Sequence, residues 1–457
     1  MPSPSASCRP RQPRRADAAQ RGSPTREAAK RDRPHLLFCG LVHLAHLSLR
    51  NFRNYAALEM PLEPGLIVLH GPNAQGKTNI LEAVALLATG SSYRAASDRE
   101  TIRWEAPPED RVARITGRVR LPGLDETGAR MASGPTPLSR QAEAAGALAS
   151  AADDSGAAEA TEFEVELLVA DMPGLSTKRA RINGAARRVV DLVGRLTMVF
   201  FGPDQLDLVI GSPHHRRAYL DTAIGQVDHG YYRATLQYNR VLQQRNQLLK
   251  QARERQVRAD ELLYWDEQMV EQGGAIIQGR ARALLPLAEL AGQEQQRLAP
   301  RRGQLSVGYD TKLFGGSADC DRLAAMPADE VQAEYRQRLA LEHERELAQG
   351  SCVVGPHRDD VTLLLDGRPL ERFGSRGQQR TAALALKLAE LGFLRRHTGQ
   401  HPVLLLDDVL SELDEDRRAA LAGIMVEQEQ VLFTTTEATA VPARASYEVR
   451  GGSLLRA

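Results

Sequence analysis

Gly71-Pro72-Asn73-Ala74-Gln75-Gly76-Lys77-Thr78 fits the phosphate-binding pattern G-x-x-x-x-G-K-[ST]. The apolar run at residues 66–69 predicts a buried strand before it, and apolar side chains at helical spacing predict a helix after it. In this context the loop N–H groups are expected to bind the phosphates of ATP or GTP. Lys77 would reach the outer phosphates, and the Thr78 hydroxyl would ligate Mg²⁺.

A second anion site is predicted more than 300 residues further along the chain. Residues 373–380 read Phe-Gly-Ser-Arg-Gly-Gln-Gln-Arg and precede an apolar helical pattern, so Ser375 is expected where a helix begins. Its hydroxyl and the free N–H groups of the first turn, which includes Gly377 and Gln378, could bind a phosphate.

Two carboxylates complete the predicted catalytic set with Lys77. The apolar run at residues 403–406 predicts a strand that ends at Asp407 and Asp408. Asp407 is placed to hold Mg²⁺ beside the phosphate loop, which is the Walker B role. Asp408 is placed to orient or deprotonate the attacking water. Residues 411–414, Ser-Glu-Leu-Asp, follow in the position of a D-loop.

The order of these motifs resembles that of ABC-type ATPases, whose two heads pack head to tail with ATP between them. This resemblance implies that Ser375 meets the nucleotide held by a second copy of the chain. A closer resemblance, to the RecF family of bacterial DNA replication and repair proteins, covers the chain from Val42 onward apart from one insertion. It rests on residues 49–55, 76–79 with 81–83, 211–217 with 219–221, and 355–360.

The RecF resemblance implies an ABC/SMC-like head with a helical lobe and no long coiled coil. It further implies ATP and Mg²⁺ as cofactors, slow DNA-stimulated ATP hydrolysis that acts as a switch, and an ATP-dependent homodimer. Single-stranded and gapped double-stranded DNA are the implied ligands. Cooperation with RecR and RecO in loading RecA at gaps, and a part in the SOS response, are also implied.

The fold class predicted from these motifs is α/β, a P-loop NTPase head of ABC/SMC type with a mostly helical second lobe inserted in the chain. Residues 42–212 and 350–457 are expected to form the head, and residues 213–349 the lobe. Residues 1–41 are basic and poor in apolar side chains, so they are expected to be disordered, as is the Ala-, Gly- and Ser-rich insertion at residues 123–160.

Composition agrees with a large globular protein. The chain has 457 residues, is 42% hydrophobic and carries a net charge of +1, so DNA binding would need local clusters of Lys and Arg. No apolar run approaches the ~18 residues that span a bilayer. The four cysteines show neither disulfide nor metal spacing, which favours the cytoplasm.

Some positions depart from the expected patterns or stay open. Ala74 stands where glycine is common, and a positive φ there would cost about 1 kcal/mol. Thr436 falls where many ABC ATPases carry a switch histidine, and a hydroxyl cannot act as a titrating switch. Asp204 or Gln205 is the candidate for a further Mg²⁺ contact, with a plain strand-ending turn as the alternative.

Three basic regions have alternative interpretations. Arg216 and Arg217 could contact DNA or pack against the head, and His357 and Arg358 could position the signature helix or contact the nucleotide. The lobe could bind DNA through basic and aromatic side chains, or these could be an ordinary solvated helix face. They are Arg233, Arg240, Arg245, Lys250, Arg253, Arg255 and Arg258, with Tyr231, Tyr232 and Tyr238.

Two other classes of protein share the phosphate loop: the ATPase subunit of an ABC-type transporter and a self-contained P-loop kinase. In a transporter subunit the signature lies much closer to the loop than the 304 residues that separate Gly71 from Ser375. A kinase should lack the signature at residues 375–379.

Overall fold

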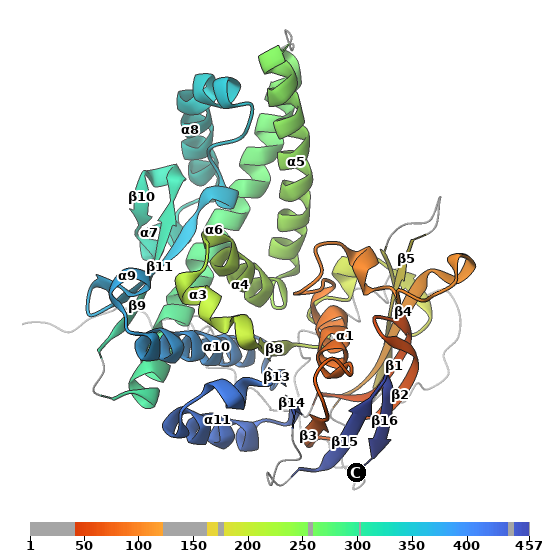
Figure 1. The fold of residues 1–457 in the computed structure, drawn as a ribbon. Coiled ribbons are helices and arrows are strands. Elements are labelled where there is room, and N and C mark those ends of the chain that lie inside the picture. The colour runs from red at the N-terminus through yellow and green to blue at the C-terminus, as the bar shows by residue number, and fades with distance from the viewer. Residues whose placement is uncertain are drawn as a thin grey trace, which may run out of the picture. The chain divides into compact units, whose positions relative to one another are not determined.

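The computed structural model describes residues 42–121, 162–171, 178–254, 259–300, 303–436 and 443–456 (Figure 1). All of them belong to the larger of the two units into which the chain divides, Cys39–Ala457. The predicted extension at residues 1–41 and the predicted insertion at residues 123–160 lie outside the described residues. Within the described ranges, no helix is long and apolar enough to cross a membrane.

A six-stranded sheet carries the phosphate loop, with the order β16-β15-β3-β14-β13-β8. Its neighbouring strands are parallel except for the antiparallel pair of β15 and β16. The strands predicted at residues 66–69 and 403–406 are confirmed. The six strands are β3 (Gly65–His70), β8 (Met198–Phe201), β13 (Val403–Asp407), β14 (Gln430–Thr435), β15 (Ala445–Arg450) and β16 (Ser453–Arg456).

Both faces of this sheet are covered, which explains why its central strands are continuously apolar. Alternate residues face opposite ways, so Leu405 and Leu432 pack in one hydrophobic cluster while Leu404 and Phe433 pack in the other. The first cluster includes helix α1 (Lys77–Thr89). The second includes α10 (Arg376–Thr398) and α11 (Glu415–Glu427).

A second, wholly antiparallel sheet, called sheet A, packs its inner face against the cluster that holds α1. Its order is β2-β1-β4-β5-β6-β7. The last two strands of this order form a hairpin that turns at Asn183 and Gly184, with φ of 49° and 75°. The strands are β1 (His43–Phe52), β2 (Tyr55–Pro61), β4 (Val112–Arg120), β5 (Glu162–Ala170), β6 (Lys178–Ile182) and β7 (Ala185–Arg187).

The lobe is mostly helical, and α5, α6 and α8 stand side by side in it (Figure 1). Its helices are α4 (Pro213–Gly225), α5 (His229–Glu254), α6 (Ala259–Leu298), α7 (Cys320–Ala325) and α8 (Ala328–Gln349), preceded by α3 (Asp207–Ile210). A small antiparallel sheet joins strands from both sides of the predicted boundary at residue 349. It contains β9 (Leu305–Thr311), β10 (Gly316–Ala318), β11 (Asp360–Leu365) and β12 (Arg368–Pro369), after which α9 (Leu370–Phe373) leads to α10.

Candidate nucleotide-binding site

The phosphate loop connects β3 to α1 through three residues with left-handed or otherwise positive φ. Gly71 has φ 135°, Ala74 has φ 63° and Gly76 has φ 115°. Ala74 therefore does adopt the conformation for which a Cβ costs about 1 kcal/mol. At Gly76 a Cβ would lie 2.6 Å from Nδ2 of Asn54 and 2.7 Å from Oη of Tyr55, so this position needs glycine for space as well as for backbone angle.

Residues that follow β1 hold the loop in place. Asn54 donates from Nδ2 to the Gln75 carbonyl at 2.9 Å, and Tyr55 donates from Oη to the Gly76 carbonyl at 3.1 Å. Asn79, on the first turn of α1, donates to Oδ1 of Asn54 at 2.8 Å. The motif at residues 49–55 thus acts as a support beneath the phosphate loop.

An ion pair anchors the same segment to α1. Arg53 donates from Nε and Nη2 to the two carboxylate oxygens of Glu82, at 2.9 and 2.6 Å, and the Glu82 side chain is 0% exposed. Arg94, in the loop after α1, lies 4.0 Å from Glu82 and donates to Oδ1 of Asn79 at 3.2 Å. Sequence reasoning missed Arg94, because nothing in its neighbours shows that the chain folds back onto the loop.

Lys77 begins α1 and is buried within the loop. Its Nζ donates to the carbonyls of Gly71 and Pro72, at 2.7 and 2.9 Å. Burial lowers the pKa of Lys77, while the nearby carboxylates of Asp408 and Asp407 act in the opposite direction. The first N–H groups of α1 have no partner within the helix, so the loop offers both a cation and N–H donors to an anion.

The Walker B strand meets the phosphate loop at Asp407. Thr78 donates from Oγ1 to Oδ1 of Asp407 at 2.9 Å, and Thr434 donates to the same oxygen at 2.7 Å. A hydroxyl and a carboxylate side by side are the oxygen ligands that Mg²⁺ takes, so these two side chains fit the predicted metal site. The described residues contain no cluster of three or more His, Cys, Asp or Glu that could hold a metal.

Thr434 is a functional neighbour that the sequence did not reveal. It is fully buried on β14, and its carbonyl and Oγ1 also accept from the N–H of Asp408, at 3.3 and 3.1 Å. Asp408 has a φ of 51°, which ends the strand one residue after Asp407. Thr434 therefore fixes the carboxylate of Asp407 and the backbone of Asp408 at the edge of the sheet.

The signature segment begins a helix as predicted. Ser375 is the N-cap of α10, where its Oγ accepts from the N–H of Gln378 at 3.3 Å and its own N–H donates to the Gln378 side chain at 2.8 Å. This capping box leaves the Ser375 hydroxyl proton free to donate outward.

Arg417 ties the signature helix to the segment after Walker B. From α11 it donates to the Gly377 carbonyl at 2.8 Å and to Oγ1 of Thr381 at 2.9 and 2.7 Å, and it pairs with Asp414, the N-cap of α11. The D-loop and the first turn of α10 therefore share one buried guanidinium.

The two remaining candidates for nucleotide contact lie at strand ends. Asp204 is exposed and Gln205 is half-buried in the short 3₁₀-helix that follows β8. Because β8 runs parallel to β13, these residues follow the same edge of the sheet as Asp407, and a metal contact there stays a prediction. Thr436, which falls in the position of the switch histidine, directly follows β14.

The proposed DNA-binding surface on the lobe is wrong for three of its residues. Arg245 is 0% exposed and pairs with Asp266 and Glu346, each at 2.6 Å, while Tyr231 and Tyr238 are buried. These side chains face the helices packed against α5, so they belong to the core. Arg255 and Arg258 lie outside the described residues.

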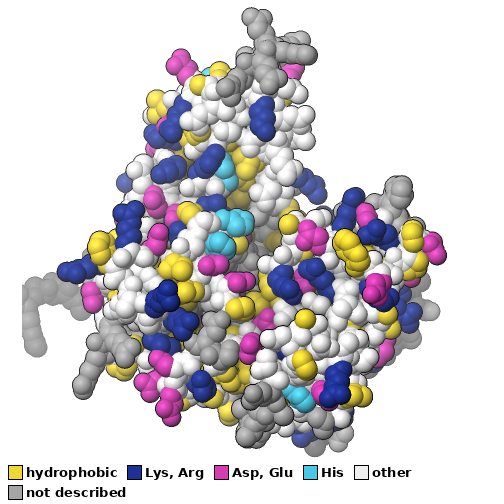
Figure 2. Space-filling model, viewed as in Figure 1, with side chains coloured by type: hydrophobic (Ala, Val, Ile, Leu, Met, Phe, Trp, Pro, Cys, Tyr) yellow, Lys and Arg dark blue, Asp and Glu magenta, His cyan; other side chains and the backbone are white. Residues whose placement is uncertain are grey.

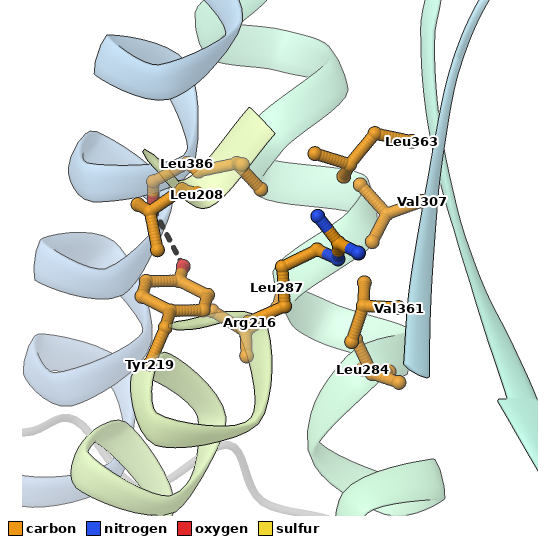
Figure 3. Close-up of a pocket in the computed structure, with 9 residues that line it drawn as sticks. All are labelled: Leu208, Arg216, Tyr219, Leu284, Leu287, Val307, Val361, Leu363 and Leu386. Atoms are coloured by element: carbon orange, nitrogen blue, oxygen red, sulfur yellow. Dashed lines mark hydrogen bonds between the residues drawn. The ribbon is translucent and has the colours of Figure 1, made fainter. Parts of the chain in front are cut away.

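The arginines at the start of α4 pack inside the protein. Arg216 donates to both carboxylate oxygens of Asp360, at 2.7 and 2.8 Å, and Arg217 donates to the Asp359 carbonyl at 2.7 Å. Figure 3 shows Arg216 reaching into a small pocket that is otherwise lined mainly by Leu and Val side chains, beside the bond from Tyr219 to the Leu386 carbonyl. The packing alternative therefore holds for Arg216.

His357 and Arg358 lie at the base of the lobe. The Nδ1 of His357 is 2.7 Å from Oη of Tyr238, and Arg358 donates to the Cys352 carbonyl at 2.9 Å. Burial lowers the pKa of His357 to about 4. These contacts tie the loop before β11 to α5.

The fold and this site define a P-loop ATPase head of the ABC/SMC type with an inserted, mostly helical lobe. A family model described as the RecF/RecN/SMC N terminal domain matches residues 43–449. The chain belongs to the RecF family of DNA replication and repair proteins. RecF of Chloroflexus aurantiacus is 39% identical over 412 residues, which cover 87% of this chain and 94% of that protein. RecF of Halothermothrix orenii is 34% identical over 422 residues, which cover 91% of this chain and 99% of that protein.

Solved structures agree. The recombination mediator protein RecF of the RecFOR pathway, in its structure with ATPrS, has a TM-score of 0.75 and 27% identity, covering 91% of this chain and 98% of that one. The structure of RecF with ATP has a TM-score of 0.74 and 27% identity, and the match covers 93% of this chain and 100% of that one.

Proposed function

We propose that this chain is an ATP-dependent DNA-binding switch of replication and recombinational repair. The observation that carries the proposal is the 2.9 Å bond between Thr78 and Asp407, which joins two halves of a nucleotide site that lie 329 residues apart in sequence. The similarity to RecF structures with ATP and ATPrS supports ATP as the nucleotide.

The side chains of the site divide the chemistry among them. Lys77 binds the outer phosphates, and Thr78 and Asp407 hold Mg²⁺, which supplies positive charge against the phosphates when it is bound. Asp408 orients the attacking water and accepts its proton. Because all of these come from one chain, a single copy binds ATP.

The signature is the part of the site that a second copy completes. Ser375 presents its hydroxyl, with the N–H groups of the first turn of α10, to the nucleotide held by Lys77 of the partner. ATP binding then assembles a homodimer on single-stranded or gapped double-stranded DNA, and slow, DNA-stimulated hydrolysis releases it. The ABC-type order of motifs supports this arrangement.

The partners and the cellular role in this proposal are inferred from the similarity to RecF. The similar RecF structures are described as belonging to the RecFOR pathway, which supports RecR and RecO as partners. RecA loading at single-strand gaps, a part in the SOS response and a cytoplasmic location complete the proposal.

The test separates nucleotide binding from assembly. Ser375→Arg should bind ATP with an affinity near that of the wild type, while bulk and charge abolish the ATP-dependent dimer in light scattering. Lys77→Met should bind ATP far more weakly, because the charge opposite the phosphates is gone. Asp408→Asn should give a dimer that persists with ATP and hydrolyses it slowly or not at all.

A matched control is Ser212→Arg, which makes the same change at the N-cap of α4. Ser212 makes no side-chain cap hydrogen bond, so this variant tests only added bulk and charge at a helix start. It should dimerise normally, which would show that this change elsewhere in the chain does not block assembly. ATPase activity measured with and without gapped duplex DNA completes the test. Full activity of a monomeric Ser375→Arg protein would overturn the composite site and favour a self-contained P-loop enzyme.

A further inference from the structure

The outer face of sheet A is open, on the side opposite α1. Strands of an antiparallel sheet alternate between the core and solvent, and here Ile115 and Leu167 point inward into the cluster with α1. Their neighbours Arg114 and Arg118 point outward and are exposed. Nothing in the described chain covers this face with a second layer of helix or sheet, so the side chains that it carries face solvent or a partner.

One row of this face holds arginines on three strands. Arg50 of β1 stands directly opposite Arg114 of β4. Leu168 of β5 lies between Arg114 and Arg179 of β6, directly opposite each of them. Like charges directly opposite each other destabilise a sheet. Among the described residues, neither Arg50 nor Arg179 has a carboxylate within ion-pair distance. The row therefore carries positive charge that the fold itself does not use.

The nearby carboxylates are too few to neutralise the face. Glu166 is shared by Arg114 at 3.1 Å and Arg181 at 3.3 Å. Glu162 pairs with Arg120, and Glu164 stands opposite Arg118. The strand register places six arginines on this face, which we call the arginine face: Arg50, Arg114, Arg118, Arg120, Arg179 and Arg181. The same register places four glutamates on it, Glu59, Glu162, Glu164 and Glu166, so the face carries two more positive than negative charges.

An exposed tryptophan lies at the edge of the arginine face. Trp104 is 92% exposed, and it follows Arg103, whose N–H donates to the Asn51 carbonyl at 2.7 Å. This bond places the tryptophan segment beside the end of β1, next to Arg50. A solvated indole beside the guanidinium of Arg50 is a combination that can bind a nucleic acid backbone and stack on an unpaired base.

In Figure 2, Lys and Arg side chains are interspersed with Asp and Glu over the lobe and the head, and no large patch of one charge is visible on this face. The DNA-binding surface predicted on the lobe also has fewer exposed cations than the sequence suggests, because Arg245 is buried. The arginine face is different, since its excess of charge is set by the register of the strands.

We propose that the arginine face binds the DNA backbone and that Trp104 stacks on an unpaired base at a gap. The inference rests on the proposed function and names the contact surface for its DNA. Since phosphates carry no sequence information, this contact is tolerant of sequence. It also leaves the phosphate loop uncovered, because α1 lies on the inner side of sheet A.

The test uses the full chain and a fluorescent gapped duplex, with binding measured by anisotropy from 50 to 200 mM KCl. Arg50→Ala with Arg179→Ala removes two guanidinium groups that hold no ion pair among the described residues, so the fold should be unaffected. The slope of log K against log[KCl] should fall by about 1.8, that is about 0.9 for each phosphate that is no longer neutralised. ATP affinity should not change.

The control is the pair Arg322→Ala and Arg395→Ala, which removes the same charge from exposed positions on α7 and α10. Its salt slope should stay near that of the wild type. An unchanged slope in the Arg50 and Arg179 variant would overturn the proposal and leave the face to a protein partner. Equal reductions of the slope in both pairs would also overturn it, because net charge alone would then explain the effect.

Trp104→Ala tests the stacking contact separately. Binding to the gapped duplex should weaken roughly 5- to 100-fold, with little change for a blunt duplex of the same length. Equal effects on the two DNAs would refute stacking at the gap. If the wild-type chain binds neither DNA at 50 mM KCl, the proposed function itself fails, and this result is distinct from a wild type that binds while the variants bind equally well.

Discussion

Replacing Arg53 by Met tests how the phosphate loop is supported. The change removes both hydrogen bonds to Glu82 and leaves that carboxylate at a site with 0% exposure. Removing one partner of a buried ion pair costs about 3–5 kcal/mol. Ser92 still donates to Glu82, and Arg94 still lies 4.0 Å away, so we expect the low end, about 3 kcal/mol.

The assay is urea unfolding followed by far-UV circular dichroism. With a slope of about 3 kcal/mol per molar urea, the midpoint should fall by about 1 M. Replacing the pair together, Arg53→Met with Glu82→Leu, should recover most of this loss, because no charge is then left buried without a partner.

Arg103→Met is the matched control, since Arg103 pairs with an exposed partner, Glu105. Its cost should stay below about 0.5 kcal/mol, as for other exposed ion pairs. The reasoning is refuted if Arg53→Met costs no more than this control, or if the double variant is as unstable as Arg53→Met alone.

Three further predictions concern other buried groups. In urea unfolding, Arg245→Ala should lower the free energy of unfolding by about 3–5 kcal/mol, whereas Arg240→Ala, at an exposed position, should change it by less than about 0.5 kcal/mol. Similar values for the two variants would show that Arg245 is not held in a buried ion pair. Burial lowers the pKa of His357 to about 4, below the unfolded value of about 6.5, so the stability that its neutral form contributes is full above pH 6.5 and is lost as pH falls toward 4. Between pH 7 and pH 5 the free energy of unfolding of His357→Asn should therefore fall by about 2 kcal/mol less than that of the wild type, and equal losses would contradict this. Arg417→Lys should weaken the ATP-dependent dimer in light scattering but not ATP binding by one copy, whereas Arg418→Lys should do neither; normal assembly of the Arg417 variant would show that its bonds to the signature helix are not needed.

Local signals in the sequence predicted the elements that carry the site. The phosphate loop, the helix start at Ser375 and the strand that ends at Asp407 each depend on residues within a few positions of one another. Helix α6 lies within the mostly helical lobe that the sequence predicts at residues 213–349. These features need no knowledge of distant contacts.

Features that depend on distant partners were missed. Arg245 finds Asp266 and Glu346 on two other helices, so a charge-rich stretch of α5 looked like a solvated face. Thr434 stands in a run of three threonines, and only the alternation of β14 decides which of them meets Asp407. A buried ion pair and an exposed one have the same local composition, and therefore sequence pattern alone does not separate them.

The motifs that suggested the RecF resemblance serve two different physical purposes. Lys77 and Thr78 face the nucleotide site, whereas arginines in other motifs pair with buried or half-buried carboxylates far along the chain. They are Arg53 with Glu82, and Arg216 with Asp360; Asp221 pairs in turn with Arg280 of α6. The first pair fixes the support of the phosphate loop to α1, and the other two fix α4 between the head and the lobe. Substitutions at these pairs should therefore lower stability before they lower the intrinsic affinity for ATP, while substitutions at Lys77 should do the reverse.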